Sequence, residues 1–464
     1  MGNGVVFELS EQSIAAIEEI VETILGKDKA TLTIRDRENG QILYAYRGDH
    51  LMRTASNMKI ISGAAALAVL GKDYQFKTYI YTDGMLEDGI LNGNVYIKGG
   101  ADPTLGEETF QRFAQILLEN NIQKINGQLL GDDTLFSGDT LPPGVDDEGE
   151  THYYGARVSA LSMSPNSDYD ASTIIVTATP GEIGEKPAFE VIPHLCGMHI
   201  TNEANTVASN EENTLEIRRL NNTDQIVITG NLPQNDSAKV WVSLQHPTKN
   251  TLQLLKAMCE QAGIEFLRQD VIDVSEVPDN AKLLYTYDGS TVGEIFSVFM
   301  KLSNNSIADI FTKLMGRQQY GVGDYDSGIR VLKQYLRSHQ IEIGNWRFAD
   351  GSGLSHNIRV HSNGLSELLF KLQKEPYFDM FYESLPVAGN PDRLIGGTLK
   401  ERFTEQKFEN RIIAKTGYIH EVNTLSGYFI GDSGKEYIFS LLLEGREEGI
   451  PFLDSGLSRI IEVL

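Results

Sequence analysis

A serine and a lysine three residues apart, Ser56 and Lys59, open a run through residues 60–70 that is rich in alanine and leucine and has no proline. Such a run predicts a largely buried helix, and serine is a preferred residue at the N-cap, so we expect Ser56 to cap it. Residues three apart share a helix face, which brings the Ser56 hydroxyl and the Lys59 amine within hydrogen-bond reach. We expect the chain to be organised around this element.

The chemistry of this pair depends on where the lysine lies. A serine hydroxyl is a poor nucleophile at neutral pH, and a lysine amine can act as its base only if burial or a neighbouring cation lowers the pKa of the amine. The backbone N–H groups of the first helical turn would favour negative charge that develops on a substrate. A second interpretation stays open, in which Ser56 is only a cap and Lys59 extends into water.

Composition restricts the class of protein. A chain of 464 residues exceeds one usual core, so two or three domains are expected. A net charge of −24 argues against nucleic acid or anionic lipid as the main partner. Cys196 and Cys259 have no C-x-x-C or histidine-rich context, which argues against a metal site or a disulfide framework. No apolar stretch predicts a transmembrane helix, and residues 1–6 lack the basic region of a secretion signal.

The pattern along the chain predicts a domain that is interrupted by a long insert. An amphipathic helix over residues 11–25, after a capping Ser10, precedes a hairpin of strands 30–35 and 41–46. Short strands and turns then dominate, and we expect residues 281–287 to form a strand that returns to the first domain. Further elements are expected as strands at 79–82, 95–98, 127–132, 174–179, 225–229 and 239–244, and as helices at 110–120 and 251–262.

The last third predicts helices and then strands. Helices are expected at 292–300, 307–314, 325–336, 359–374 and 452–464, and strands at 412–414, 426–430 and 437–443. The fold class is therefore a multi-domain α/β (α+β) chain with a helical layer. We expect one domain from residues 1–77 and 286–464, an inserted α+β domain from 78–164 and 246–285, and a nested β-rich insert at 165–245.

Two further motifs follow in the chain. Ser303-Asn304-Asn305 falls between two helical stretches, where a hydroxyl and an amide could project from a short turn, although capping alone would also explain this serine. Lys415-Thr416-Gly417 closes the strand-like residues 412–414. A strand edge offers backbone groups to an extended peptide, and Lys415 with Thr416 can hold a carboxylate. The alternative is a solvated strand end.

The ordered set S-x-x-K, S-x-N and K-T-G resembles the motif set of penicillin-binding proteins and related serine β-lactamases. The chain is similar to a low-molecular-mass class C penicillin-binding protein, of the D-alanyl-D-alanine carboxypeptidase/endopeptidase family. This resemblance implies the transpeptidase domain of that fold, with a helical layer and an antiparallel sheet. The likeness covers nearly the whole chain, including the long insert between the first two motifs. It extends to residues 99–105, 156–162, 350–355, 385–389 and 425–428.

The resemblance implies a role for each motif residue. Ser56 would be the acylated nucleophile, Lys59 its base, and Ser303 the relay that passes a proton to the leaving group. Asn305 would bind the substrate amide, and Lys415 would lower the pKa of Lys59 and attract the terminal carboxylate.

Strand residues would complete the site. Thr416 and Gly417 would bind the substrate, and the backbone N–H groups of Ser56 and Tyr418 would form the oxyanion hole. Relatives commonly carry threonine where this chain has Tyr418, and often arginine near the position of His356. The resemblance therefore predicts a weakened grip on a free carboxylate and on a charged stem side chain.

The resemblance also implies the partners. The substrates would be peptidoglycan stem peptides, β-lactam antibiotics would acylate the same serine, and no metal or cofactor would be needed. The location would be extracytoplasmic, in the cell envelope or secreted. Two alternatives stay open, a catalytically silent relative that binds these peptides, and an esterase or D-aminopeptidase on the same scaffold.

Overall fold

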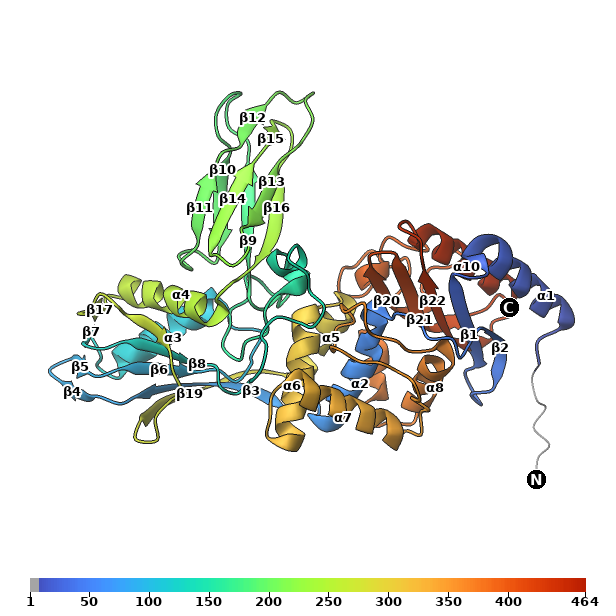
Figure 1. Cartoon of the computed structure of the whole chain (residues 1–464), viewed down its shortest axis with the longest axis horizontal. Coiled ribbons are helices and arrows are strands. Elements are labelled where there is room, and N and C mark those ends of the chain that lie inside the picture. The colour runs from blue at the N-terminus through green and yellow to red at the C-terminus, as the bar shows by residue number, and fades with distance from the viewer. Residues whose placement is uncertain (1–7) are drawn as a thin grey trace. The chain divides into compact units, whose positions relative to one another are not determined.

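The computed structural model describes residues 8–464, so the opening residues considered above for a secretion signal lie outside it (Figure 1). The chain divides into two compact units. The first contains the chain up to Lys72 together with Val292–Asn304 and Tyr325–Leu464, and the second contains Asp73–Thr291 and Asn305–Asp324.

An antiparallel sheet of five strands, in the order β2-β1-β22-β21-β20, forms the centre of the first unit. The predicted hairpin and the three predicted C-terminal strands are confirmed as its members. β20 lies at one edge of the sheet. The strands are β1 (Ala30–Asp36), β2 (Ile42–Tyr46), β20 (Ile412–Ile419), β21 (Val422–Ile430) and β22 (Glu436–Glu444).

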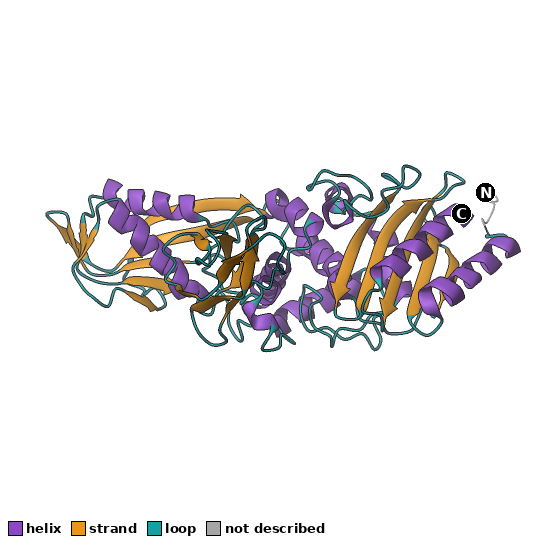
Figure 2. Ribbon diagram, turned by 90° about the horizontal axis from the view of Figure 1, so that it is seen from above, coloured by secondary structure: helices purple, strands orange, loops and turns teal. Residues whose placement is uncertain are grey.

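Helices cover both faces of this sheet (Figure 2). Leu32 and Ile34 of β1 belong to a buried cluster with residues of α1 (Glu11–Ile20) and α10 (Ile450–Val463). Thr33, which alternates with them, points to the other face, where its hydroxyl bonds to Ser362 at the start of α8 (Ser362–Leu372). The predicted cap of the first helix is confirmed, because the Ser10 hydroxyl accepts from the Ser13 N–H at 3.0 Å.

The remaining helices of the first unit form the predicted helical layer, whereas the π-helical turn Val21–Gly26 continues α1 and packs with α10. α2 is largely buried as predicted, and α9 has no counterpart among the predicted elements. The elements are η1 (Val21–Gly26), η2 (Ala55–Asn57), α2 (Met58–Val69), α5 (Val292–Lys301), α7 (Tyr325–Ser338), α9 (Phe378–Ser384) and η5 (Gly397–Leu399).

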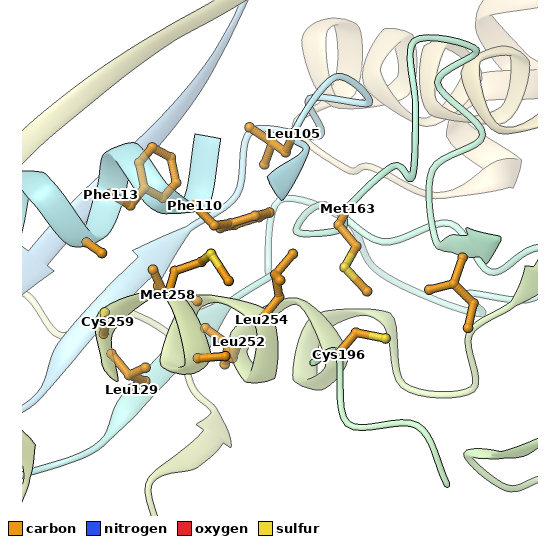
Figure 3. Packing of buried hydrophobic residues seen from close by; sticks show 14 of the residues in the cluster. Leu105, Phe110, Phe113, Leu129, Met163, Cys196, Leu252, Leu254, Met258 and Cys259 are labelled. Carbon is orange, nitrogen blue, oxygen red and sulfur yellow. The ribbon is translucent and has the colours of Figure 1, made fainter. Parts of the chain in front are cut away.

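The second unit contains two mixed sheets and a core between its helices. In Figure 3, Phe110 of α3 faces Leu254 and Met258 of α4, and all three side chains are buried. The strand orders are β18-β8-β6-β3-β19 and β17-β7-β5-β4. The elements are β3 (Gln75–Thr82), β4 (Met85–Glu87), β5 (Ile90–Asn92), β6 (Val95–Lys98), α3 (Glu107–Glu119), β7 (Lys124–Ile125), β8 (Leu129–Asp132), η3 (Gly149–Thr151), η4 (Tyr153–Gly155), α4 (Pro247–Gln261), β17 (Glu265–Phe266), β18 (Ile272–Val274), β19 (Lys282–Thr291) and α6 (Asn305–Tyr320).

A group of short strands lies between β8 and α4, in the part of the chain predicted as a nested insert. It has the strand orders β10-β9-β16, β11-β14-β13 and β12-β15. The strands are β9 (Thr173–Thr179), β10 (Ala188–Ile192), β11 (His199–Asn202), β12 (Asn205–Val207), β13 (Glu216–Arg219), β14 (Gln225–Thr229), β15 (Asn231–Pro233) and β16 (Ala238–Ser243).

One expectation about the insert is wrong. β19, expected to return to the first domain, pairs along its length with β3 and stays in the second unit. Its cross-strand partners decide its place, and these cannot be seen in the local pattern. The division into three domains stays a prediction.

Candidate active site

Ser56 lies in a single 3-10 turn that leads into the buried helix. Ser56 lies at the entrance of the helix, as predicted, but it is not the N-cap, because Asn57 holds that position and no side-chain bond caps the helix. The preceding Ala55 has φ 44, in the left-handed region, which costs a residue with a Cβ roughly 1–2 kcal/mol. Such conformations cluster at functional sites. The turn leaves Ser56 partly exposed, whereas Ala55 and Asn57 are buried.

Lys59 lies one turn further along and is fully buried. Its Nζ donates to the Ser56 Oγ at 2.8 Å and to the Ser352 carbonyl at 2.9 Å. The predicted contact between the serine and the lysine is therefore present. The interpretation in which Lys59 extends into water is wrong for this structure.

The Lys415 side chain connects the K-T-G motif with the S-x-N motif. Its Nζ donates to the Ser303 Oγ at 2.8 Å and to the Thr416 carbonyl at 2.9 Å. Ser303 is the residue between α5 and α6 with φ 58, again in the left-handed region. Burial, and secondly the charge of Lys59, lowers the pKa of Lys415 well below its ordinary value. Lys59 and Lys415 are thus both fully buried, and each contacts one of the two serines, Ser56 and Ser303.

Asp350 has a buried carboxyl group to which the three sequence motifs assign no role. It accepts from the Gly353 N–H at 2.7 Å and the Ser355 N–H at 2.8 Å. Burial raises the pKa of Asp350, whereas these N–H groups and the charge of Lys59 act in the opposite direction. An aspartate before Gly-Ser-Gly is typical of a turn in which the carboxylate accepts from the backbone N–H groups that follow. This sequence signal could have identified Asp350.

The K-T-G motif lies inside β20 and not beyond its end, which corrects the expected position. Along the outer edge of β20, the Ala388 N–H donates to the Ile412 carbonyl and the Ala414 N–H donates to the Pro386 carbonyl. In residues 8–464, no strand pairs with that edge from Lys415 onward. The motif therefore stands where the edge strand becomes open to an added peptide.

Gly417 permits the close approach of the strand to the nucleophile turn. A Cβ at this position would lie 2.1 Å from the Thr424 Oγ1 and 2.9 Å from the Ser56 N. Asn57 fixes the same contact, because its Nδ2 donates to the Lys415 carbonyl at 2.8 Å. No larger residue fits here without moving the turn.

Three further predicted residues differ in their exposure and contacts. Tyr418 is 59% exposed at the end of the motif. His356 has its Nδ1 2.9 Å from the Arg53 Nη1, and burial, followed by the charge of Arg53, lowers the pKa of His356. Asn305 begins α6 in the second unit, where its Nδ2 donates to the Tyr154 carbonyl at 3.0 Å.

Three further features of the described residues concern metal ligands, membrane-spanning helices and thiols. In the part of the chain that the structure describes, no three His, Cys, Asp or Glu side chains lie together as metal ligands would. Within residues 8–464, none of the helices combines the length and the apolar character that a membrane span needs. Cys196 and Cys259 are free and buried, and burial raises the pKa of these thiols to about 11 and about 12.

The arrangement can perform acyl transfer. A partly exposed hydroxyl is in contact with a buried amine, a second amine is in contact with a second hydroxyl, and backbone N–H groups of the turn and the strand lie beside them. These are the parts that nucleophilic catalysis with charge stabilisation needs.

Comparison with known proteins gives consistent results. The model of the D-Ala-D-Ala carboxypeptidase 3 (S13) family matches residues 12–451. A D-alanyl-D-alanine carboxypeptidase of Actinomadura sp. is 31% identical over 428 residues, which cover 90% of this chain and 78% of the relative. The D-alanyl-D-alanine carboxypeptidase DacB of Haemophilus influenzae is 25% identical over 415 residues, which cover 88% of this chain and 84% of the relative.

Solved structures show the same fold. The crystal structure of penicillin-binding protein 4 from Haemophilus influenzae superposes with a TM-score of 0.82 at 21% identity, over 95% of this chain and 98% of that chain. The same protein in complex with a β-lactam gives a TM-score of 0.75 over 95% of this chain and 97% of that chain. The predicted fold class is therefore confirmed.

Proposed function

Because the chain belongs to the D-Ala-D-Ala carboxypeptidase 3 (S13) family, we propose that it hydrolyses peptidoglycan peptides through an acyl-enzyme at Ser56. It is a serine-type carboxypeptidase that releases the terminal D-alanine, and it also acts as an endopeptidase on D-amino-acid cross-links. One observation carries this proposal. The Ser56 Oγ lies 2.8 Å from the Nζ of a fully buried Lys59.

The contacts supply each part of the reaction. Lys59 takes the proton from the Ser56 Oγ, which attacks the carbonyl carbon of the penultimate residue. The C–N bond then breaks, and Ser303, in contact with Lys415, passes a proton to the leaving amine of D-alanine. Water hydrolyses the resulting ester, which returns the proton to Ser56 and releases the shortened peptide.

The oxyanion and the substrate need further partners. Ser56 N lies close to the backbone at Gly417, which supports an oxyanion hole formed by the N–H groups of Ser56 and Tyr418. Lys415 supplies positive charge for the terminal carboxylate, and Thr416 donates to it. Asn305, the last residue of the S-x-N motif, binds the substrate amide.

The remaining parts of the proposal follow from the substrate. β-Lactams acylate Ser56 because their strained amide meets the same nucleophile. The substrate lies in the cell wall, so the protein acts outside the cytoplasm. His356, whose lowered pKa keeps it mostly neutral at pH 7, lies in the stem-binding region and supplies no fixed positive charge to an acidic stem side chain.

Mass spectrometry after exposure to penicillin tests the proposal. We expect one penicilloyl adduct on the peptide that contains Ser56, none on Ser56→Ala, and release of D-alanine from a peptide that ends in D-Ala-D-Ala. Ser433→Ala, at an exposed serine in the turn between β21 and β22, is the matched control and should be acylated normally. An adduct elsewhere would refute the role of Ser56. An adduct without peptide hydrolysis would mean a silent binder.

A further inference from the structure

Thr398 lies outside all three motifs, yet its side chain meets one of them. Its Oγ1 is 2.6 Å from the Oγ1 of Thr416 in K-T-G. Thr416 is buried, at 7% exposure, whereas Thr398 is exposed. A second hydroxyl therefore stands beside the motif threonine, on the side that solvent and a ligand can reach.

The fold fixes the position of Thr398. It is the central residue of the short turn η5, and the next residue, Leu399, is fully buried. Gly397 has φ 54, and a Cβ there would lie 2.4 Å from the Lys301 carbonyl. Lys301 also donates from its Nζ to the Ile395 carbonyl at 2.9 Å. The turn is thus held against the end of α5, two residues before Ser303.

Two adjacent hydroxyls suit a carboxylate. Each threonine hydroxyl has one proton to donate, and only one of the two protons is used in their mutual contact. A carboxylate has two oxygens that accept, so it can take a proton from each threonine in place of that contact. The Lys415 ammonium, bonded to the Thr416 carbonyl at 2.9 Å, adds positive charge at the same peptide group.

We propose that Thr398 determines specificity by donating, together with Thr416, to the free carboxylate of the C-terminal D-residue. It supplies, from a separate segment, the hydroxyl that is missing where this chain has Tyr418. The inference rests on the proposed function, because it names the group that binds one end of the proposed substrate.

Matched substrates and matched variants test it. We would measure kcat/KM on a peptide that ends in D-Ala-D-Ala and on the same peptide with a C-terminal amide. Thr398→Val keeps the shape and removes the hydroxyl, and loss of a hydrogen bond to a charged group should lower the free-acid value about ten- to a hundred-fold. The amide should lose several-fold less. Thr398→Ser should stay close to wild type, as should the control Thr404→Val, at an exposed threonine nearby.

A rescue variant separates a binding role from a structural one. Adding Tyr418→Thr to Thr398→Val should restore at least part of the free-acid activity, because a hydroxyl returns to the same carboxylate. If Thr398→Val lowers kcat/KM equally on both peptides, or does not lower it on the free acid, the inference is overturned. The proposed function stays intact in that case, because the wild type is active. A wild type that neither forms the Ser56 adduct nor hydrolyses either peptide would overturn the proposed function, and this inference with it.

Discussion

Lys301 is a buried lysine whose ionisation should appear in the stability of the protein. Its side chain is 3% exposed, and its Nζ donates to the carbonyls of Leu385 and Ile395. Burial lowers its pKa from 10.5 to about 8, against the weaker opposing effect of Asp392 and Glu383. We therefore predict that the difference in unfolding free energy between wild type and Lys301→Met depends on pH.

The direction follows from proton binding. Below pH 8, Lys301 is charged in both the folded and the unfolded state. Between pH 8 and 10.5 the unfolded chain still binds the proton and the folded protein does not, so the unfolding free energy rises with pH. The full change from 10.5 to about 8 corresponds to about 3 kcal/mol, at about 1.36 kcal/mol for each pH unit. Lys301→Met lacks this contribution.

Urea unfolding from pH 7.5 to 10.5 measures the effect. Both proteins should carry Trp241→Phe, so that Trp346, which is 6% exposed in the first unit, is the fluorescent reporter. Other titrating groups occur in both proteins and cancel in the difference. We expect wild type to gain up to about 3 kcal/mol over the variant across this range. A difference that stays constant or falls would refute a pKa lowered by burial.

Three further predictions concern the site and the insert. An arginine at position 59 cannot deprotonate, so Lys59→Arg should lower the rate of penicillin acylation at least ~10²-fold, measured by timed mass spectrometry. The control Lys72→Arg, at an exposed lysine near the same helix, should not change this rate. Asp350→Asn removes the negative charge that faces Lys59, so the acid limb of the pH–acylation profile should move to lower pH, and an unmoved limb would contradict this electrostatic role. Replacing residues 180–237 with Asn-Gly joins the ends of β9 and β16, which are antiparallel neighbours. Penicillin acylation should stay measurable in this variant. Loss of acylation together with unfolding of the whole chain would show that the removed strands belong to the main core.

Local patterns predicted most elements because their causes are local. α2 follows from an apolar run without proline, and the cap at Ser10 follows from a serine before an amphipathic helix. The cap at Ser56 was predicted by the same rule and is wrong. The chain enters α2 through a 3-10 turn that begins at Ala55 with a left-handed φ, a conformation that alanine rarely takes, and the local pattern could not reveal this turn.

The site divides in the same way. The contact between Ser56 and Lys59 could be predicted because residues three apart along continuous helical backbone lie on the same side, and the two later motifs gave the pair its chemical meaning. Asp350 approaches Lys59 from nearly three hundred residues away, and no periodicity connects the two positions. Its neighbours Gly351 and Ser352 contact α2 through their carbonyls, which accept from Ser62 and Lys59. Such backbone contacts leave no trace in residue type.

Carboxylate recognition shows why a departure from a motif does not by itself establish a lost contact. A hydroxyl can donate to a carboxylate from any segment of the chain, provided that its oxygen lies within hydrogen-bond distance. Threonine is a common residue, so nothing in the sequence marks Thr398 as such a donor. Tyr418 is 59% exposed at the end of the motif, whereas Thr398 lies 2.6 Å from the Thr416 hydroxyl. The expectation of a weakened grip on the free acid assumed that the missing donor had to come from the strand itself. If Thr398 donates as proposed, the donor comes from a separate turn beside that strand, and exopeptidase activity on free D-alanine ends is the expected result.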